Sequence, residues 1–131
     1  MRWRIEDTPE QTAFREEFRG WLKDNLNEGW MEAIDAGDES AIEKARANWD
    51  LMTWNRTIGS SGYAAPLWPK EYGGLAGEVW MQNVVREELA RYRLPLLGVN
   101  ILGIGLAGPT LIQHGTDAQK ERFLPKILTS E

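Results

Sequence analysis

A glycine-rich segment is the first feature of this chain whose residue types and spacing suggest chemistry. Residues 103–108, Gly-Ile-Gly-Leu-Ala-Gly, match the G-x-G-x-x-G pattern of dinucleotide-binding proteins. That pattern works only when a strand precedes it and a helix N-terminus follows it, so that backbone amides face a pyrophosphate. Nothing upstream has the character of an isolated strand, and Pro109 follows at once. We therefore interpret the small residues as positions where a buried helix approaches its neighbours closely.

Nucleophilic and metal-binding arrangements have even less support. Residues 59–62, Gly-Ser-Ser-Gly, lack the G-x-S-x-G spacing of a nucleophile elbow and indicate a turn. His114 is the only histidine, and Asp117 is the only acid close to it, so we interpret His114 as a helix cap or surface residue. The chain has no cysteine, which excludes thiol nucleophiles, thiolate metal sites and disulfides. We predict no catalytic, cofactor-binding or metal-binding residue in this chain.

Paired carboxylates and tryptophans complete the set of chemically suggestive residues. Adjacent side chains on a helix point about 100° apart, so neither Glu16-Glu17 nor Glu87-Glu88 can share a proton, and we interpret both pairs as solvated faces. There are 7 tryptophans. Trp21 and Trp49 fall on apolar stripes and are expected in the core. Trp68 lies in a loop and is the tryptophan that packing explains least readily.

Length and charge limit the class of protein. A chain of 131 residues suits one domain with its own core. The 15 Lys and Arg against 20 Asp and Glu give a net charge of −5, and their interleaving argues against binding to nucleic acid. The N-terminus has no apolar stretch behind its charges, so no signal or transit peptide is expected. The lack of cysteine fits a reducing compartment, and we expect the cytoplasm.

One uncharged segment raises the question of a membrane span. Residues 94–113 carry no charge and are long enough to cross a bilayer. They also contain four glycines and two prolines, which makes the segment less apolar than a typical span. We therefore favour a buried helix and expect no membrane span.

The spacing of apolar residues elsewhere predicts an all-α bundle of five or six helices with a long loop rich in glycine, proline and aromatic residues over 59–77. Capping boxes mark three helix starts, at Thr8, Ser40 and Thr116. Pro125 is expected to kink or break the last helix, whose buried side is predicted to comprise Phe123, Leu124 and Ile127. The other helices are predicted over residues 9–26, 40–59, 78–92 and 96–113.

Four motifs in a fixed order carry a family resemblance. They are Gly62-Tyr63-Ala64-Ala65-Pro66, Trp68-Pro69-Lys70-Glu71-Tyr72-Gly73-Gly74, Glu87-Glu88-Leu89-Ala90-Arg91 and Gly115-Thr116-Asp117-Ala118-Gln119-Lys120-Glu121-Arg122-Phe123-Leu124-Pro125. From about Thr8 to Glu131, the chain resembles the N-terminal α-helical domain of an acyl-CoA dehydrogenase. On this reading residues 1–131 form one domain, without the middle β-domain and the C-terminal helical domain of that family.

The resemblance implies an FAD-dependent oxidoreductase of lipid metabolism. Such enzymes remove hydrogens from Cα and Cβ of an acyl-CoA thioester, form a trans-2-enoyl-CoA and pass electrons to an electron-transferring flavoprotein. The catalytic glutamate and the flavin belong to the family's other domains, so we expect this chain alone to bind no FAD and to be inactive. Its expected contribution is the wall of the acyl pocket together with domain or subunit contacts in a homo-oligomer or with a partner chain.

The acyl pocket is expected at the predicted helix over 96–113, because the family's corresponding helix lines the deep end of the acyl cavity. At 100° per residue, Val99, Leu102, Gly103 and Leu106 share one side of this helix and are expected to face the acyl group. The glycines suggest a long or bulky acyl group, and both fatty acid and sterol side chains remain open.

Two other functions stay open from the sequence. The chain could be a non-catalytic helical module that binds a partner through its apolar surface, or a membrane-associated unit that uses residues 94–113. We also expect the isolated chain to self-associate, since its helices would expose surface that other domains cover.

Overall fold

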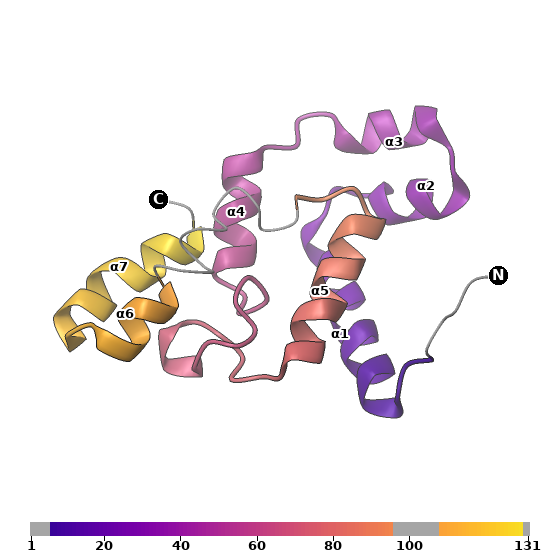
Figure 1. Ribbon diagram of the computed structural model, residues 1–131. Helices are drawn as coiled ribbons and strands as arrows, with labels where there is room; N and C mark the ends of the chain where they lie inside the picture. Colours follow the sequence, from indigo (N-terminus) through magenta and orange to yellow (C-terminus); the bar gives the residue numbers. More distant parts are fainter. Residues whose placement is uncertain (1–5, 96–107, 130–131) are drawn as a thin grey trace.

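The structure is a computed structural model that describes residues 6–95 and 108–129, and every regular element in that part of the chain is helical (Figure 1). The predicted all-α class is confirmed, with seven α-helices among the described residues where five or six were expected. In chain order the elements are α1 (Pro9–Asn25), α2 (Trp30–Ala36), α3 (Glu39–Arg46), α4 (Leu51–Gly59), the 3-10 helix η1 (Lys70–Tyr72), α5 (Val79–Arg91), α6 (Gly108–His114) and α7 (Asp117–Thr129).

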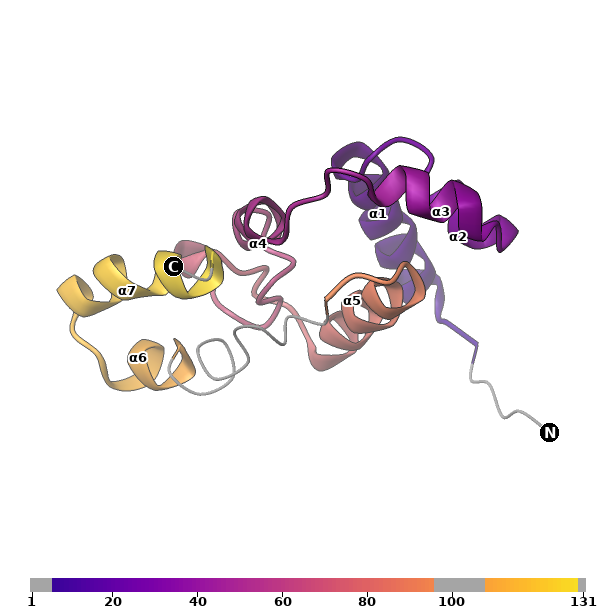
Figure 2. The same cartoon turned by 90° about the horizontal axis from the view of Figure 1, so that it is seen from above.

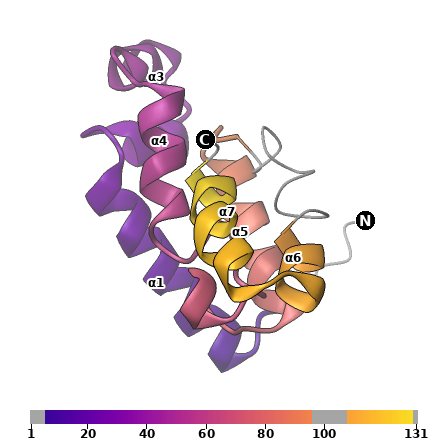
Figure 3. The same ribbon diagram turned by 90° about the vertical axis from the view of Figure 1, so that its left-hand side faces the viewer.

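The helices pack in pairs on either side of α4. Helix α1 packs along α5, α2 pairs with α3, and α6 pairs with α7, which also contacts η1 and α4. Figures 1 and 2 place α4 between the α1–α5 pair and the α6–α7 pair, and Figure 3 shows α4 beside α7. One continuous core joins both sides. It comprises Phe18, Leu22, Trp30, Ala45, Trp54, Ile58, Tyr63, Ala64, Ala65, Trp68, Val85, Leu89, Tyr92, Leu94, Leu124 and Leu128.

Two of the predicted capping boxes are confirmed. The Thr8 hydroxyl accepts a hydrogen bond from the Gln11 backbone N–H at 3.2 Å, and the Gln11 side chain accepts one from the Thr8 N–H at 2.8 Å. Thr116 and Gln119 make the same reciprocal pair at 3.2 and 2.9 Å. Each box satisfies two backbone donors that a helix start leaves unpaired, so these starts are determined locally.

The single helix predicted from Ser40 to Gly59 is wrong. The structure has two helices there, and each begins at an aspartate: Asp38 accepts from the Ala41 N–H at 3.2 Å, and Asp50 accepts from the Thr53 N–H at 2.8 Å. Between them Asn48 adopts a left-handed conformation with φ 64°, which asparagine tolerates better than most residues. Helix α2 was not predicted at all.

The corrected helix start can be tested by comparing two alanine substitutions. We expect Asp38→Ala to lower the free energy of unfolding by about 1 kcal/mol, because it removes the side-chain acceptor at the start of α3. Ser40→Ala should change it by less than about 0.5 kcal/mol, since Ser40 lies inside the helix and alanine is the better helix former. Urea unfolding followed by circular dichroism measures both free energies. If Ser40→Ala lowered the free energy of unfolding more than Asp38→Ala, Ser40 would be the N-cap residue instead of Asp38.

Helix α7 continues through Pro125 to Thr129, so Pro125 does not break it, and the alternative of a kink stays a prediction. A proline removes one intrahelical hydrogen bond, but Leu124 and Leu128 lie one turn apart and are both buried. Their burial against the rest of the core holds the helix on both sides of Pro125. Leu124 was predicted correctly, Ile127 is half-buried, and Phe123 is 41% exposed, contrary to prediction.

Candidate functional site

The four residues predicted to line an acyl pocket, Val99, Leu102, Gly103 and Leu106, lie outside the described residues. The same is true of most of the predicted helix over 96–113, whose last part corresponds to α6. The acyl-pocket assignment therefore stays a prediction.

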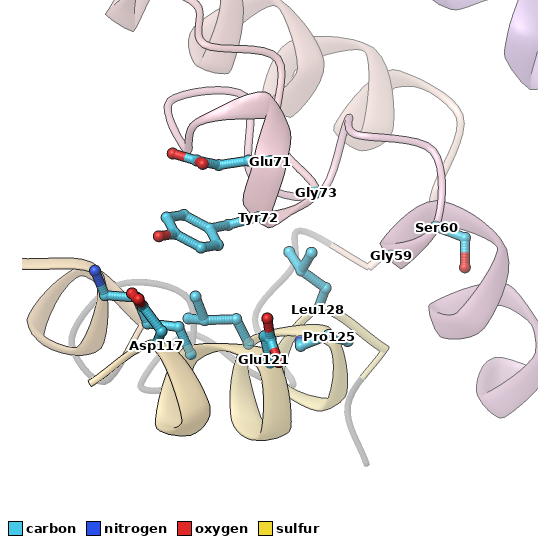
Figure 4. A pocket seen from close by; sticks show the side chains of 11 residues that line it. Gly59, Ser60, Glu71, Tyr72, Gly73, Asp117, Glu121, Pro125 and Leu128 are labelled. Carbon is cyan, nitrogen blue, oxygen red and sulfur yellow. The ribbon is translucent and has the colours of Figure 1, made fainter. Parts of the chain in front are cut away.

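A groove that the sequence did not indicate lies between α7, η1 and the C-terminal end of α4 (Figure 4). It encloses about 670 Å³. Three segments far apart in the sequence build it, so no local pattern could have revealed it. Its lining residues are Gly59, Ser60, Glu71, Tyr72, Gly73, Asp117, Lys120, Glu121, Leu124, Pro125 and Leu128.

One wall of the groove is the Tyr-Gly-Gly part of the family motif. Gly73 has φ 92°, a conformation that side chains rarely adopt, and its N–H closes η1 by donating to the Lys70 carbonyl at 3.1 Å. A Cβ on Gly73 would lie 2.5 Å from Leu128 Cδ1. Figure 4 shows Leu128 of α7 extending toward Gly73. The glycine thus lets α7 dock closely against η1.

Behind this wall, Trp68 anchors the loop between α4 and α5 in the core. The Trp68 side chain is 5% exposed and belongs to the core, which answers the question left by the sequence. Its carbonyl accepts a hydrogen bond from the Ala76 N–H at 2.8 Å, and the Pro66 carbonyl accepts one from Gly77 at the same distance. Gly74 packs directly on the Trp68 and Ala65 carbonyls. Backbone hydrogen bonds and close packing around the buried Trp68 side chain therefore hold this loop in one conformation.

The charges around the groove determine what it could hold. Its rim carries three carboxylates, Glu71, Asp117 and Glu121, against the single ammonium of Lys120, which lies 5.4 Å from the centre of the Tyr72 ring. Such a rim repels a diphosphate, so the groove does not fit the FAD of the family. Across the described residues, no group of three or more His, Asp or Glu side chains could hold a metal ion.

The two candidate nucleophilic features take the structural roles that the sequence indicated. The Ser61 hydroxyl donates to the Ile58 carbonyl at 2.6 Å and accepts from the Tyr63 N–H at 3.0 Å, which builds a turn around Gly62. In Figure 4 the Ser60 side chain points away from Tyr72. His114 is exposed at the end of α6.

Glu88 contradicts the prediction that the paired acids are solvated. Its side chain is 2% exposed, whereas that of Glu87 is 61% exposed. Arg15 Nη1 donates to Glu88 Oε1 at 2.7 Å, and Arg19 donates to Glu88 through Nε at 2.7 Å and Nη2 at 3.0 Å. Asp7 also pairs with Arg15, at 2.7 Å. Glu88 of the paired-acid motif therefore joins α5 to α1. We call Glu88, Arg15 and Arg19 together the Glu88 clamp.

The clamp keeps Glu88 charged. Burial raises the pKa of Glu88, and the hydrogen bonds from Arg19 and Arg15 lower it by more, so the net pKa lies below the ordinary value. The pKa of Arg15 is raised, first by its hydrogen bond to Asp7 and then by those to Glu88 and Glu87, which outweigh the effect of burial. In the sequence, Arg15 and Arg19 share one face of α1 at i and i+4, but only the packing of α1 on α5 shows that both contact Glu88.

None of the helices in the described part of the chain has the length and apolarity needed to cross a membrane. Residues 96–107 of the uncharged segment lie outside that part.

Comparison with known proteins agrees with the family resemblance of the sequence motifs. The family model "Acyl-CoA dehydrogenase, N-terminal domain" matches residues 8–131. Acyl-CoA dehydrogenase IpdE1 of Mycolicibacterium smegmatis is 39% identical over 123 residues, which cover 91% of this chain and 30% of the relative. Acyl-CoA dehydrogenase FadE29 of Mycobacterium tuberculosis is 34% identical over 127 residues, 97% of this chain and 30% of the relative.

Two solved structures resemble the fold. The Tcur3481-Tcur3483 steroid ACAD has a TM-score of 0.64 and 28% sequence identity over 97% of this chain and 30% of its own. The ChsE4-ChsE5 complex from Mycobacterium tuberculosis has a TM-score of 0.61 and 29% identity over 97% of this chain and 29% of its own. The chain thus spans about 30% of the length of the curated relatives it matches.

Proposed function

The chain belongs to the acyl-CoA dehydrogenase family as an N-terminal domain, and on that premise we propose that it works within a complete FAD-dependent enzyme that converts acyl-CoA thioesters to trans-2-enoyl-CoA. The observation that carries this proposal is the family match over residues 8–131 together with an all-helical fold in which the Tyr-Gly-Gly and Glu-Glu motifs both have structural roles.

The proposed reaction divides the work between this chain and the rest of the enzyme. Removal of the α-proton of the thioester would require a base, and FAD, when bound, would supply the acceptor for the β-hydride. An electron-transferring flavoprotein is the proposed acceptor of the electrons. We assign the base and the flavin to the middle and C-terminal domains that the family resemblance implies, and the acidic rim of the groove beside α7 supports this by being unsuited to a diphosphate.

Two observations support a proposal for the substrate class. One similar structure is described as a steroid ACAD, and the glycines at 103 and 105 would leave room for a bulky acyl group. We therefore propose an acyl-CoA that carries a steroid-type side chain or ring system. The similar structures are also complexes of two differently named chains, which favours a second acyl-CoA dehydrogenase chain as the partner over a homo-oligomer.

The complete enzyme provides the test. Purified with its partner chain, it should bleach its flavin absorption on anaerobic addition of a steroid side-chain acyl-CoA and release the enoyl-CoA, detected by mass spectrometry. A straight-chain acyl-CoA of similar mass is the matched control and should react more slowly. Absence of bound flavin, or no reaction with any acyl-CoA, would contradict the proposal.

Gly103→Leu tests the proposed pocket wall. We expect the larger side chain to fill the deep end of the pocket and to lower kcat/KM for the bulky acyl-CoA by about tenfold or more, while a short acyl-CoA is affected less. Ile104→Leu, on the other side of the predicted helix, is the control. An unchanged preference across acyl groups in Gly103→Leu would remove Gly103 from the pocket.

A further inference from the structure

The groove between α7, η1 and the C-terminal end of α4 has no part in the proposed reaction. Helix α7 lines it with residues that recur at the spacing of one helix face: Asp117, Lys120, Glu121, Leu124, Pro125 and Leu128. Their character changes along the helix, from charged residues in its first half to apolar residues in its second. Figure 4 shows Asp117 at one end, on the side of Tyr72, and Leu128 toward Gly59 at the other. The groove therefore has a charged end and an apolar end.

At the charged end, carboxylates outnumber cations. Glu71 on η1 lies across the groove from Asp117 and Glu121 on α7, and all three are exposed. Among residues 6–95 and 108–129, none of the three belongs to an ion pair. The ammonium of Lys120 is instead 5.4 Å from the centre of the Tyr72 ring. A cation that enters this end would therefore gain attraction from three carboxylates at once.

At the apolar end, the lining offers contact without charge. Leu124 and Leu128 are buried at its base, and Pro125 is exposed beside them. Gly59 at the end of α4 and Gly73 at the end of η1 complete this part of the lining. Because neither glycine has a side chain, the space between the three segments stays open. An apolar side chain that enters this end would be removed from water, which is favourable.

We propose that the groove docks a partner protein through a segment that presents a Lys or Arg side chain about 10 Å from an apolar side chain. Glu121 and Leu128 are seven residues apart on α7, which is about 10 Å along the helix axis. Two residues seven positions apart on a partner helix, or three apart on an extended segment, match this distance. The groove volume of about 670 Å³ lies within the range of about 300–1,000 Å³ that is usual for binding clefts.

Charge complementarity identifies the occupant as a basic protein segment. Nucleic acids and anionic lipid surfaces carry the same sign of charge as Glu71, Asp117 and Glu121, so the rim repels both. A small polyamine would satisfy the charged end but would bring no apolar side chain to Pro125 and Leu128. A basic and apolar segment satisfies both ends. This inference does not rest on the proposed function, because every group that forms the groove belongs to this chain.

A peptide titration of the full 131-residue chain tests the proposal. The probe is an acetylated, amidated, alanine-based helical peptide that carries one arginine and one leucine seven positions apart. We expect saturable shifts of the backbone amide signals of Glu71, Gly73 and Glu121 in two-dimensional NMR spectra of the isotope-labelled chain. Raising the salt concentration from about 0.05 M to about 0.5 M should weaken the affinity about threefold or more, because salt screens the exposed carboxylates.

Matched changes on both sides separate the two ends of the groove. Replacing the arginine of the peptide with glutamate should weaken binding about tenfold or more, and replacing its leucine with alanine should weaken it about threefold. In the chain, Glu71→Gln combined with Glu121→Gln should weaken binding of the arginine peptide about fivefold. Glu43→Gln is the control, because Glu43 is equally exposed but lies on α3 (Figure 1), and it should leave the affinity unchanged.

Four results would overturn the proposal. They are no saturable binding of the arginine peptide, shifts that map away from the groove, equal affinity of the arginine and glutamate peptides, and an unchanged affinity in the double variant. Spermidine provides a further arm: if it displaces the peptide and the leucine-to-alanine peptide binds as tightly as the parent peptide, the groove holds small cations only. If the double variant fails to fold by circular dichroism, Glu121→Gln alone carries the test, with a loss of about twofold expected.

Discussion

Replacing Gly74 with alanine is expected to lower the free energy of unfolding by about 3 kcal/mol, at the upper end of the range for an overpacked site. The new Cβ would overlap the Trp68 carbonyl oxygen and would lie 2.5 Å from Trp68 Cβ and 2.6 Å from the Ala65 carbonyl oxygen. Backbone atoms cannot rotate away as the end of a flexible side chain can. The loop that carries the Tyr-Gly-Gly motif would have to move, and α7 would lose its close contact with η1.

Urea unfolding followed by tryptophan fluorescence measures this effect, and Gly20→Ala is the matched control. Gly20 is exposed within α1, and a Cβ there would have nothing within 4 Å. The control should be stabilised by up to about 1 kcal/mol through helix propensity alone. If Gly74→Ala proves as stable as the parent, the close packing of Gly74 on Trp68 is not essential.

Glu88→Gln is expected to cost a similar amount, about 3 kcal/mol, because it removes the charge that two partly buried arginines share. Glutamine keeps the shape of the side chain, so the loss reports the charge and its hydrogen bonds. Glu87→Gln is the control: Glu87 contacts the same Arg15 at 2.8 Å but is largely exposed, and its loss should cost less than about 1 kcal/mol. Equal effects in the two variants would contradict the clamp.

The Glu88 clamp also predicts a pH dependence. Because the folded protein lowers the pKa of Glu88, the clamp contributes its full stability above the ordinary pKa of a glutamate, about 4.3. That contribution is lost as the pH falls from there through the lower folded value. Unfolding curves from pH 7 to pH 3 should therefore show the parent and Glu88→Gln converging at the acidic end. A constant difference would mean that Glu88 does not titrate with folding.

Sequence reasoning succeeded where the determining interactions are local. The capping boxes at Thr8 and Thr116 involve residues three apart, and the structure shows both. Local reasoning failed for the Ser40–Gly59 helix because two aspartates start two helices there: Asp38 accepts from the Ala41 N–H, and Asp50 accepts from the Thr53 N–H. The motifs that resemble the acyl-CoA dehydrogenase family were readable without any structure, and the family match over residues 8–131 confirms the membership.

Contacts between residues far apart in the chain needed the tertiary structure. Glu88 looks like a surface acid until α1 brings Arg15 and Arg19 against it, and Trp68 looks like a free loop residue until the loop closes around it. The groove likewise joins separate segments. The sequence by itself therefore determined the helical class, the helix starts at Thr8 and Thr116, and the family, because these depend on residue type and short-range spacing. Only the tertiary structure decided which charges are buried and which rings touch, since desolvation and contact arise when distant segments pack.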